Sequence, residues 1–279
     1  SSVLSPIYCR ILDFPLRGQA CEGRLVPEGG LVPEWGNDSI TYKFRLIFME
    51  KPPETMKGPA LKVEAIGHQW WWEFRYPDLD LITANELHIP THRAIEIDIK
   101  AVDVIHSFWI PKLAGKMDAM PGQVNHMWLS ADKPGQYYGQ CVEFCGESHA
   151  NMRFLTYAHE SKDFDKWVEA EQADAAEPKD ATALEGQQVF MKGCNSCHTI
   201  KGTPAAGTVG PNLTHFAARH TLGSAIYEID EKNFDEYLTK WIRDPQGMKP
   251  GNLMDLSKAG MSLSDADVRA LVAYLKTLK

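Results

Sequence analysis

The most regular part of the chain is residues 61–159, where short runs alternate between apolar and polar positions. In the run 94–101, isoleucines occupy positions 95, 97 and 99, and charged side chains occupy the positions between them. Further runs rich in β-branched and aromatic residues cover 61–66, 124–129 and 154–159, and Pro-Gly pairs at 121–122 and 134–135 supply turn signals. A two-residue period bounded by turns is typical of strands, so we predict a β-sandwich.

The pattern becomes helical from residue 184 onward. Segments 184–192, 233–243 and 264–278 carry apolar residues at helical spacing. The second of them stops before Asp244-Pro245, because a proline disfavours helix at the residue that precedes it. The third begins with Asp and Ser residues and has one apolar face. We therefore predict an all-α domain at the C-terminal end.

The remaining segments divide the chain. Residues 160–183 contain eight acidic residues and three lysines, a net charge of −5 out of the chain's −8. Within them, 162–172 is a candidate short helix and the rest a solvated linker. Residues 1–50 show scattered Gly and Pro and no sustained period. We expect an irregular segment over 1–50, the β domain over 51–160, an acidic linker over 161–183 and the helical domain over 184–279.

Length and composition agree with this division. A chain of 279 residues corresponds to about two domains of ~100–200 residues each. The net charge of −8 argues against nucleic acid as a partner, because phosphate binding needs a basic face. No run of 18 apolar residues is present, so no transmembrane helix is expected. Residues 1–10 lack the charged-then-apolar order of a secretory signal.

The chain has six cysteines, and four of them form two close pairs, Cys141 with Cys145 and Cys194 with Cys197. Spacings of C-x3-C and C-x-x-C-H indicate cofactor chemistry more than disulfides. Cys9 and Cys21 have no such context, and we interpret them as free or mutually paired thiols.

The first pair belongs to a run of ligand types, C-x3-C-x3-H-x2-M, formed by Cys141, Cys145, His149 and Met152. A further candidate, His106, lies 35 residues upstream. Thiolate, imidazole and thioether together select copper. A blue-copper site uses one Cys, whereas two thiolates can bridge two copper ions. Each copper would then take one His, with Met152 and a backbone carbonyl, that of Glu143, at the outer positions.

Other readings of this loop are open. Structural zinc is one, although Met is a poor zinc ligand and zinc sites favour C-x2-C. A disulfide between Cys141 and Cys145 is another. Copper accounts for all five side chains at once and is preferred.

The second pair, with His198, forms C-x-x-C-H, the attachment signature of c-type haem. Two thiols on a short turn add across two vinyl groups, and the adjacent His then lies under the iron. A thioredoxin-like redox pair is the main rival, but it would need a βαβ context, which this helical region lacks.

A second axial ligand is expected about 50–60 residues on, where Met248, Met254 and Met261 are candidates, and Met ligation raises the potential. The segment 249–254 resembles the class I cytochrome c pattern, which favours Met254 and leaves Met248 as runner-up. Residues 210–213 resemble the family's segment whose Pro carbonyl accepts the N–H of the proximal His. We expect Met191 to be core, and His215 and His220 to face solvent.

Residues 62–159 resemble subunit II of haem-copper cytochrome c oxidases. The matching stretches are Gly-His-Gln-Trp-Trp-Trp at 67–72, Asp-Val-Ile-His-Ser-Phe at 103–108, Lys-Met-Asp-Ala-Met-Pro-Gly at 116–122, and 139–149. The resemblance implies a cupredoxin fold and a binuclear copper centre, CuA, held by the following ligands: His106, Cys141, the Glu143 carbonyl, Cys145, His149 and Met152. It also implies a magnesium site shared with subunit I through the Glu143 carboxylate, and Trp70 as the electron-entry residue. For Trp71 and Trp72 ordinary aromatic packing is preferred.

A copper domain followed by a fused cytochrome c resembles subunit II of caa3-type oxidases over residues 41–279. The resemblance implies a relay from an external donor, a cytochrome c or another respiratory carrier, through haem c to CuA and on to subunit I, where oxygen is reduced to water. It places the chain at the outer, periplasmic face of a bacterial cytoplasmic membrane. The family normally carries two N-terminal transmembrane helices, and the apolar runs expected for them are absent from this sequence.

Four alternative functions are less consistent with the sequence. A free-standing periplasmic haem and copper carrier fits the missing helices, but not the motifs that serve contact with subunit I in the family. A nitrous oxide reductase would need a large propeller, for which 279 residues leave no room. A copper-delivery protein has no use for covalent haem, and a quinol oxidase subunit loses the copper ligands. The oxidase subunit is therefore the preferred interpretation.

Overall fold

The computed structural model describes residues 33–36, 39–42, 56 and 58–279. The chain divides into two units, Ser1–Met49 and Glu50–Lys279. In the first, β1 (Pro33–Gly36) and β2 (Ser39–Tyr42) pair antiparallel, with Trp35 opposite Ile40. The rest of the expected irregular segment, with Cys9 and Cys21, lies outside the described residues.

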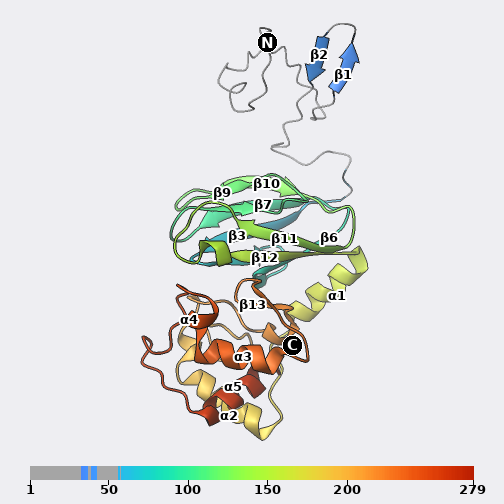
Figure 1. Ribbon diagram of the computed structural model, residues 1–279. Helices are drawn as coiled ribbons and strands as arrows, with labels where there is room; N and C mark the ends of the chain where they lie inside the picture. Colours follow the sequence, from blue (N-terminus) through green and yellow to red (C-terminus); the bar gives the residue numbers. More distant parts are fainter. Residues whose placement is uncertain (1–32, 37–38, 43–55, 57) are drawn as a thin grey trace. The chain divides into compact units, whose positions relative to one another are not determined.

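The second unit begins with two five-stranded sheets (Figure 1). One has the order β10-β7-β3-β4-β5, with β3 and β7 parallel and the other neighbours antiparallel. The other has the order β6-β12-β11-β8-β9, with β6 and β12 parallel. The bounds are β3 (Leu61–His68), β4 (Trp71–Tyr76), β5 (Leu81–Ala84), β6 (Glu86–Pro90), β7 (Ile95–Ala101), β8 (His106–Trp109), β9 (Met117–Ala119), β10 (Asn125–Leu129), β11 (Gly135–Cys141) and β12 (Arg153–His159). The β-sandwich prediction is confirmed.

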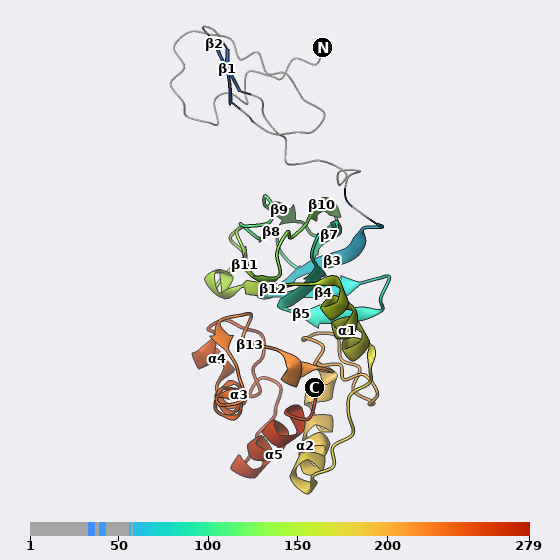
Figure 2. The same ribbon diagram turned by 90° about the vertical axis from the view of Figure 1, so that its right-hand side faces the viewer.

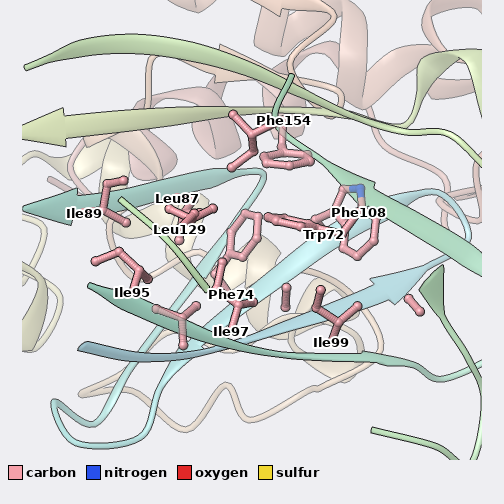
Figure 3. Packing of buried hydrophobic residues seen from close by; sticks show 14 of the residues in the cluster. Trp72, Phe74, Leu87, Ile89, Ile95, Ile97, Ile99, Phe108, Leu129 and Phe154 are labelled. Atoms are coloured by element: carbon pink, nitrogen blue, oxygen red, sulfur yellow. The ribbon is translucent and has the colours of Figure 1, made fainter. Parts of the chain in front are cut away.

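The core between the sheets follows the predicted alternation. Along β7 the isoleucines at 95, 97 and 99 are buried and the charged residues between them are half-buried. Aromatic rings fill the centre (Figure 3): Phe108 stacks on Phe154 with ring centroids 4.9 Å apart, and Trp72 and Phe108 meet edge to face with centroids 5.4 Å apart. Gly139 faces Phe154 so closely that a Cβ would lie 2.1 Å from its ring. Only glycine therefore fits at this position of β11.

Helix α1 (Ser161–Gln172) follows the sandwich and matches the short helix predicted at 162–172. Its buried Phe164 and half-buried Trp167 pack against the core of the sandwich. The ring centroid of Trp167 lies 5.5 Å from that of Tyr76 and 4.3 Å from that of His88. The first half of the expected acidic linker is thus an amphipathic helix that covers one end of the β domain (Figure 2).

The C-terminal region is helical, as predicted. It contains α2 (Ala181–Met191), η3 (Cys194–Ser196), η4 (Phe216–Ala218), β13 (Thr221–Leu222), β14 (Tyr227–Glu228), α3 (Phe234–Arg243), α4 (Pro245–Met248) and α5 (Asp265–Leu275). A capping box between Ser264 and Asp267 starts α5. Helices α2 and α5 cross closely because Gly186 has no side chain: a Cβ there would lie 1.9 Å from the Ala270 carbonyl oxygen. Within the described ranges, no helix is both long enough and apolar enough to span a bilayer.

The expectation for His215 was wrong. Its side chain is buried, with Nδ1 3.0 Å from the Lys279 carbonyl oxygen and Nε2 3.1 Å from that of Ala173. It therefore ties the chain's end to the segment after α1, a contact between distant loops that no periodicity reports. His220 is exposed, as expected, and Met191 packs against the helical core.

Burial of His88 predicts a pH-dependent stability. Its Nδ1 lies 2.9 Å from His159 Nε2, and its ring stacks on Trp167. Burial, with the nearby His159 and His220, holds the pKa of His88 well below its usual range. Below the unfolded-state pKa of about 6.5 the unfolded chain therefore binds more protons than the folded chain. The contribution of neutral His88 to the free energy of unfolding should be fully present above that pH and should be lost as the pH falls toward the folded-state pKa. The total loss should be about 1.4 kcal/mol for each pH unit by which the folded-state pKa lies below the unfolded-state pKa.

Urea unfolding at pH 7.5 and pH 5 measures this loss. The His88→Phe variant keeps a ring against Trp167 and cannot titrate, so its stability should fall less between the two pH values than that of the unmodified protein. The matched control is His126→Gln, which removes an exposed histidine. An equal loss in the unmodified protein and in His88→Phe would contradict the assignment.

Candidate metal centre and haem site

The candidate copper ligands lie at one end of the second sheet. His106 begins β8, Cys141 ends β11, and the returning loop brings Met152 beside Cys141, whose N–H donates to the Met152 carbonyl at 2.9 Å. The Val142 N–H donates to the Ser107 carbonyl at 3.1 Å, which fixes the loop to β8. Two strand pairings therefore place residues 35 positions apart in one pocket.

The donor atoms converge there on a central pair of sulfurs, with Cys141 Sγ 3.8 Å from Cys145 Sγ. His106 Nδ1 lies 3.9 Å from Cys141 Sγ, and His149 Nδ1 lies 3.4 Å from Cys145 Sγ. The outer positions are filled by the Glu143 carbonyl oxygen, 3.3 Å from Cys141 Sγ, and by Met152 Sδ, 3.8 Å from Cys145 Sγ. All six predicted groups are thus brought together.

The donor types of this pocket fit copper. His106, Cys141, Cys145 and Met152 are buried, and the ligand atoms of the first three lie within 4.8 Å of one another. A soft set of thiols, imidazoles and a thioether favours copper over magnesium or calcium, which need oxygen ligands. Two sulfurs with an imidazole near each can serve two ions.

The two cysteine side chains are linked by a hydrogen bond between their sulfurs. The hydrogen bond from Cys145 lowers the pKa of Cys141 to about 4, and the same interaction raises the pKa of Cys145 well above its usual range. The hydrogen bond therefore favours ionisation of Cys141 over ionisation of Cys145. Metal binding would release the second proton.

Asp103 orients the first imidazole. Its carboxylate lies 2.8 Å from His106 Nε2 and accepts from the backbone N–H groups of Gln69 at 2.6 Å and Val104 at 2.7 Å. Burial alone would raise the pKa of Asp103, but these hydrogen bonds hold it below its ordinary value. Because Nε2 donates to Asp103, Nδ1 is left free to face Cys141. Asp103 is not among the site residues predicted from the sequence, although its position three residues before His106 was the available signal.

Trp70 contacts the ligand loop directly. It is buried, and its Nε1–H donates to the Cys145 carbonyl at 2.9 Å; Gln69 Nε2 donates to the same oxygen at 2.7 Å. Trp71 stacks on His68 at 4.1 Å, and Trp72 lies in the aromatic core. Trp71 and Trp72 therefore take part in aromatic packing, and the ring of Trp72 also lies edge-on to that of His106, with centroids 6.0 Å apart. Of the three tryptophans, Trp70 is the one whose indole N–H donates to the ligand loop.

The C-x-x-C-H motif is built on η3, which carries Cys194, while Cys197 follows directly. His198 Nδ1 donates to the Pro211 carbonyl at 2.8 Å, as the sequence predicted, and this leaves Nε2 free for iron. Gly210 packs on the imidazole, where a Cβ would lie 2.5 Å from His198 Cε1. A half-buried His held in one orientation beside two half-buried thiols fits covalent haem.

The methionine candidates are placed differently. Met248 packs against the helical core and its carbonyl accepts from the Tyr227 hydroxyl at 2.8 Å. Met261 lies against Gly193, just before the motif: a Cβ on Gly193 would lie 2.4 Å from its sulfur. Met254 is half-buried, and its N–H donates to Asn252 Oδ1 at 2.9 Å. The choice of Met254 stays a prediction.

Comparison with known proteins gives two family models. Residues 79–158 match "Cytochrome C oxidase subunit II, periplasmic domain", and residues 183–279 match "Cytochrome c". Cytochrome c oxidase subunit 2 of Bacillus subtilis is 36% identical over 251 residues, which cover 85% of this chain and 68% of the relative. The chain belongs to the cytochrome c oxidase subunit 2 family.

Two further similarities concern a curated relative and a solved structure. The subunit 2 of Alkalihalophilus pseudofirmus is 40% identical over 235 residues, 84% of this chain, and the chain spans 66% of that relative's length. The solved periplasmic domain of subunit II of cytochrome oxidase from Bradyrhizobium japonicum has 34% identity and a TM-score of 0.40, covering 42% of this chain and 97% of that one. The family implies copper and haem, which agrees with the two donor sets described above.

The role of Asp103 can be tested with Asp103→Asn. Removing the charge behind His106 Nε2 should weaken copper binding about 10- to 100-fold, as loss of such a partner typically does. Isothermal titration of the metal-free protein with copper measures the change.

The matched control is Asp98→Asn, which removes the carboxylate 2.7 Å from the exposed His126. It should leave copper affinity unchanged. Equal affinities for Asp103→Asn and the unmodified protein would show that Asp103 does not orient His106.

Proposed function

We propose that this chain is the electron-transfer subunit II of a haem-copper terminal oxidase. It would accept electrons from an external donor at haem c and pass them through CuA to subunit I, which reduces oxygen to water. The observation that carries the proposal is the convergence of two thiols, two imidazoles, a thioether and a carbonyl around the 3.8 Å sulfur pair. The conversion of oxygen belongs to the partner subunit.

In the proposal, the copper pair is held by His106, Cys141, the Glu143 carbonyl, Cys145, His149 and Met152. The haem is attached to Cys194 and Cys197, with His198 and Met254 as axial ligands. When bound, the groups supply one-electron chemistry: iron cycles between Fe(III) and Fe(II), and the copper pair takes up a single electron. The protein's part is to fix the ligands, since a buried and pre-shaped site changes little on reduction.

Trp70 is the proposed electron-entry residue. Its indole packs on Gly146 of the copper loop, and its Nε1–H donates to the carbonyl of Cys145, a proposed copper ligand. It is buried by the chain itself, which favours delivery from the chain's own haem domain. An external cytochrome c or another respiratory carrier would then reduce the haem and not the copper.

The exposure of Glu143 and Phe144 supports a contact between this part of the copper loop and subunit I. Glu143 is exposed. The next residue, Phe144, is 77% exposed, although it directly precedes the buried Cys145. An exposed carboxylate with an apolar neighbour fits a face covered by subunit I, with magnesium shared through Glu143. We place this face, with both domains, at the outer side of a bacterial cytoplasmic membrane.

The domain limits proposed are 51–160 for the copper domain, 161–183 for the linker and 184–279 for the cytochrome c domain, after the segment 1–50. The position of α1 against the sandwich supports a linker in which residues 173–180, between α1 and α2, are free of regular structure.

Spectra of the full chain, matured with haem and loaded with copper, test the proposal. We expect two copper ions per chain with a seven-line mixed-valence EPR signal, and a low-spin c-type haem. Cys145→Ser should abolish the mixed-valence signal and keep the haem, because one sulfur cannot bridge the pair.

The reciprocal control is Cys197→Ala, which should impair haem attachment and keep the copper signal. A mononuclear copper signal in the unmodified protein, or no covalent haem after maturation, would overturn the proposal.

A further inference from the structure

Lys249, in the turn after α4, is a buried lysine with a backbone carbonyl of the copper domain as its partner. The residue is 3% exposed. Its Nζ donates to the Trp70 carbonyl oxygen and, at 2.6 Å, to Ser224 Oγ. Ser224 Oγ donates in turn to the same Trp70 carbonyl at 2.9 Å. Two side chains of the cytochrome c region therefore meet on one backbone oxygen, beside the indole that touches the copper loop.

The same turn carries the proposed axial ligand. Asn252 Nδ2 donates to the Lys249 carbonyl at 2.7 Å, and Asn252 Oδ1 accepts from the Met254 N–H at 2.9 Å. Gln246 closes the turn by donating to the Asn252 carbonyl at 2.6 Å. A displacement of Lys249 is thus transmitted to the backbone of Met254.

The side chain of Trp70 contacts the copper loop. Its Nε1–H donates to the Cys145 carbonyl, and its ring lies against Gly146, where a Cβ would be 3.0 Å from the indole. Gly251 of the turn approaches Glu147 of the copper loop to the same degree, with a Cβ position 2.9 Å from its carboxyl carbon. The turn 249–254 therefore packs on the loop that holds Cys145, and hydrogen bonds or covalent bonds connect Met254 with Cys145 without a break.

The burial of Lys249 is not explained by stability. Among the described residues, no carboxylate lies within 4.0 Å of its amine. A buried lysine without a counter-ion is costly, and an apolar residue of similar volume is often neutral or stabilising in such a place. Burial lowers the pKa of Lys249 to about 7. The burial of this amine therefore points to a role other than stabilisation.

We propose that Lys249 is a positioning residue that fixes the haem-ligand turn 249–254 on the Trp70–Cys145 segment and so sets the electron path between the two sites. This rests on the proposed function. The electron would leave iron, which passes from Fe(II) to Fe(III), and enter the copper pair; Lys249 exchanges no proton and forms no bond. A second contact, in which Glu86 accepts from the His220 N–H at 2.9 Å and the Thr221 hydroxyl at 2.6 Å, holds the two regions together independently.

The test is Lys249→Met in the full, doubly loaded chain. Intramolecular electron transfer after rapid reduction of the haem should slow by about 10- to 100-fold, the scale of a roughly 1 Å misplacement of a reacting pair. Both optical spectra should be unchanged. Lys249→Arg, which keeps a donor, should restore part of the rate. Lys258→Met, at an exposed lysine nearby in the sequence, should behave as the unmodified protein.

A second readout needs neither metal nor haem turnover. Hydrogen–deuterium exchange of the copper-free protein should become faster in the copper-loop peptide 140–152 of Lys249→Met, because the turn that covers it is released, while the thermal midpoint does not fall. Ser224→Gly is the companion variant: it removes the hydroxyl at a position with φ of +65°, which glycine adopts freely, so folding is preserved. It should show the same direction of change.

The outcomes separate the two claims. If the unmodified chain lacks the copper or haem spectrum, the proposed function fails. If it loads normally but Lys249→Met and Ser224→Gly transfer electrons and exchange hydrogen as it does, the positioning role is refuted. A lower thermal midpoint with an unchanged transfer rate would make Lys249 structural and would also refute it.

Discussion

The approach of Cys141 Sγ to within 3.8 Å of Cys145 Sγ is the interaction on which the rest of the copper domain depends. Two thiols at this distance in a buried pocket cannot both ionise without a cation, so the pocket is suited to metal. The sandwich provides the constraint: β11 ends at Cys141, β8 supplies His106 from the neighbouring strand, and Met152 is paired with Cys141 through the backbone. Each ligand is fixed by a strand end or by a short turn.

In the cytochrome c region, too, the surrounding structure fixes the orientation of a candidate ligand side chain. There the imidazole of His198 is held by one carbonyl, that of Pro211, and by the missing side chain of Gly210. Asp103 performs the equivalent task for His106 with a carboxylate. In both sites the nitrogen that does not face the metal position is engaged by a fixed acceptor, which determines the nitrogen left free.

The sequence predicted the elements well, because they follow from local patterns, and the structure brings the candidate donors of the copper loop into one pocket. Alternation at 94–101 corresponds to β7, apolar spacing at 233–243 to α3, and the ligand spacing to one pocket. It did not predict contacts between distant loops: the burial of His215 against Lys279, the burial of His88 between Trp167 and His159, or the meeting of Lys249 and Ser224 at the Trp70 carbonyl. Such contacts depend on how the helices and strands pack against one another, which local sequence patterns do not report. A single lysine in a Lys-Pro-Gly turn belongs to no periodic pattern of apolar and polar residues.

The proposed function requires that one chain hold two successive redox centres, the haem and the copper pair, of one electron path. The measurement that tests it most directly is the kinetics of electron redistribution in the doubly loaded protein after rapid reduction of the haem, followed over a range of protein concentrations. The account predicts a first-order loss of reduced haem, matched by reduction of the copper pair, with a rate constant independent of protein concentration. A rate that rises in proportion to concentration would mean that electrons pass between molecules, and would contradict it.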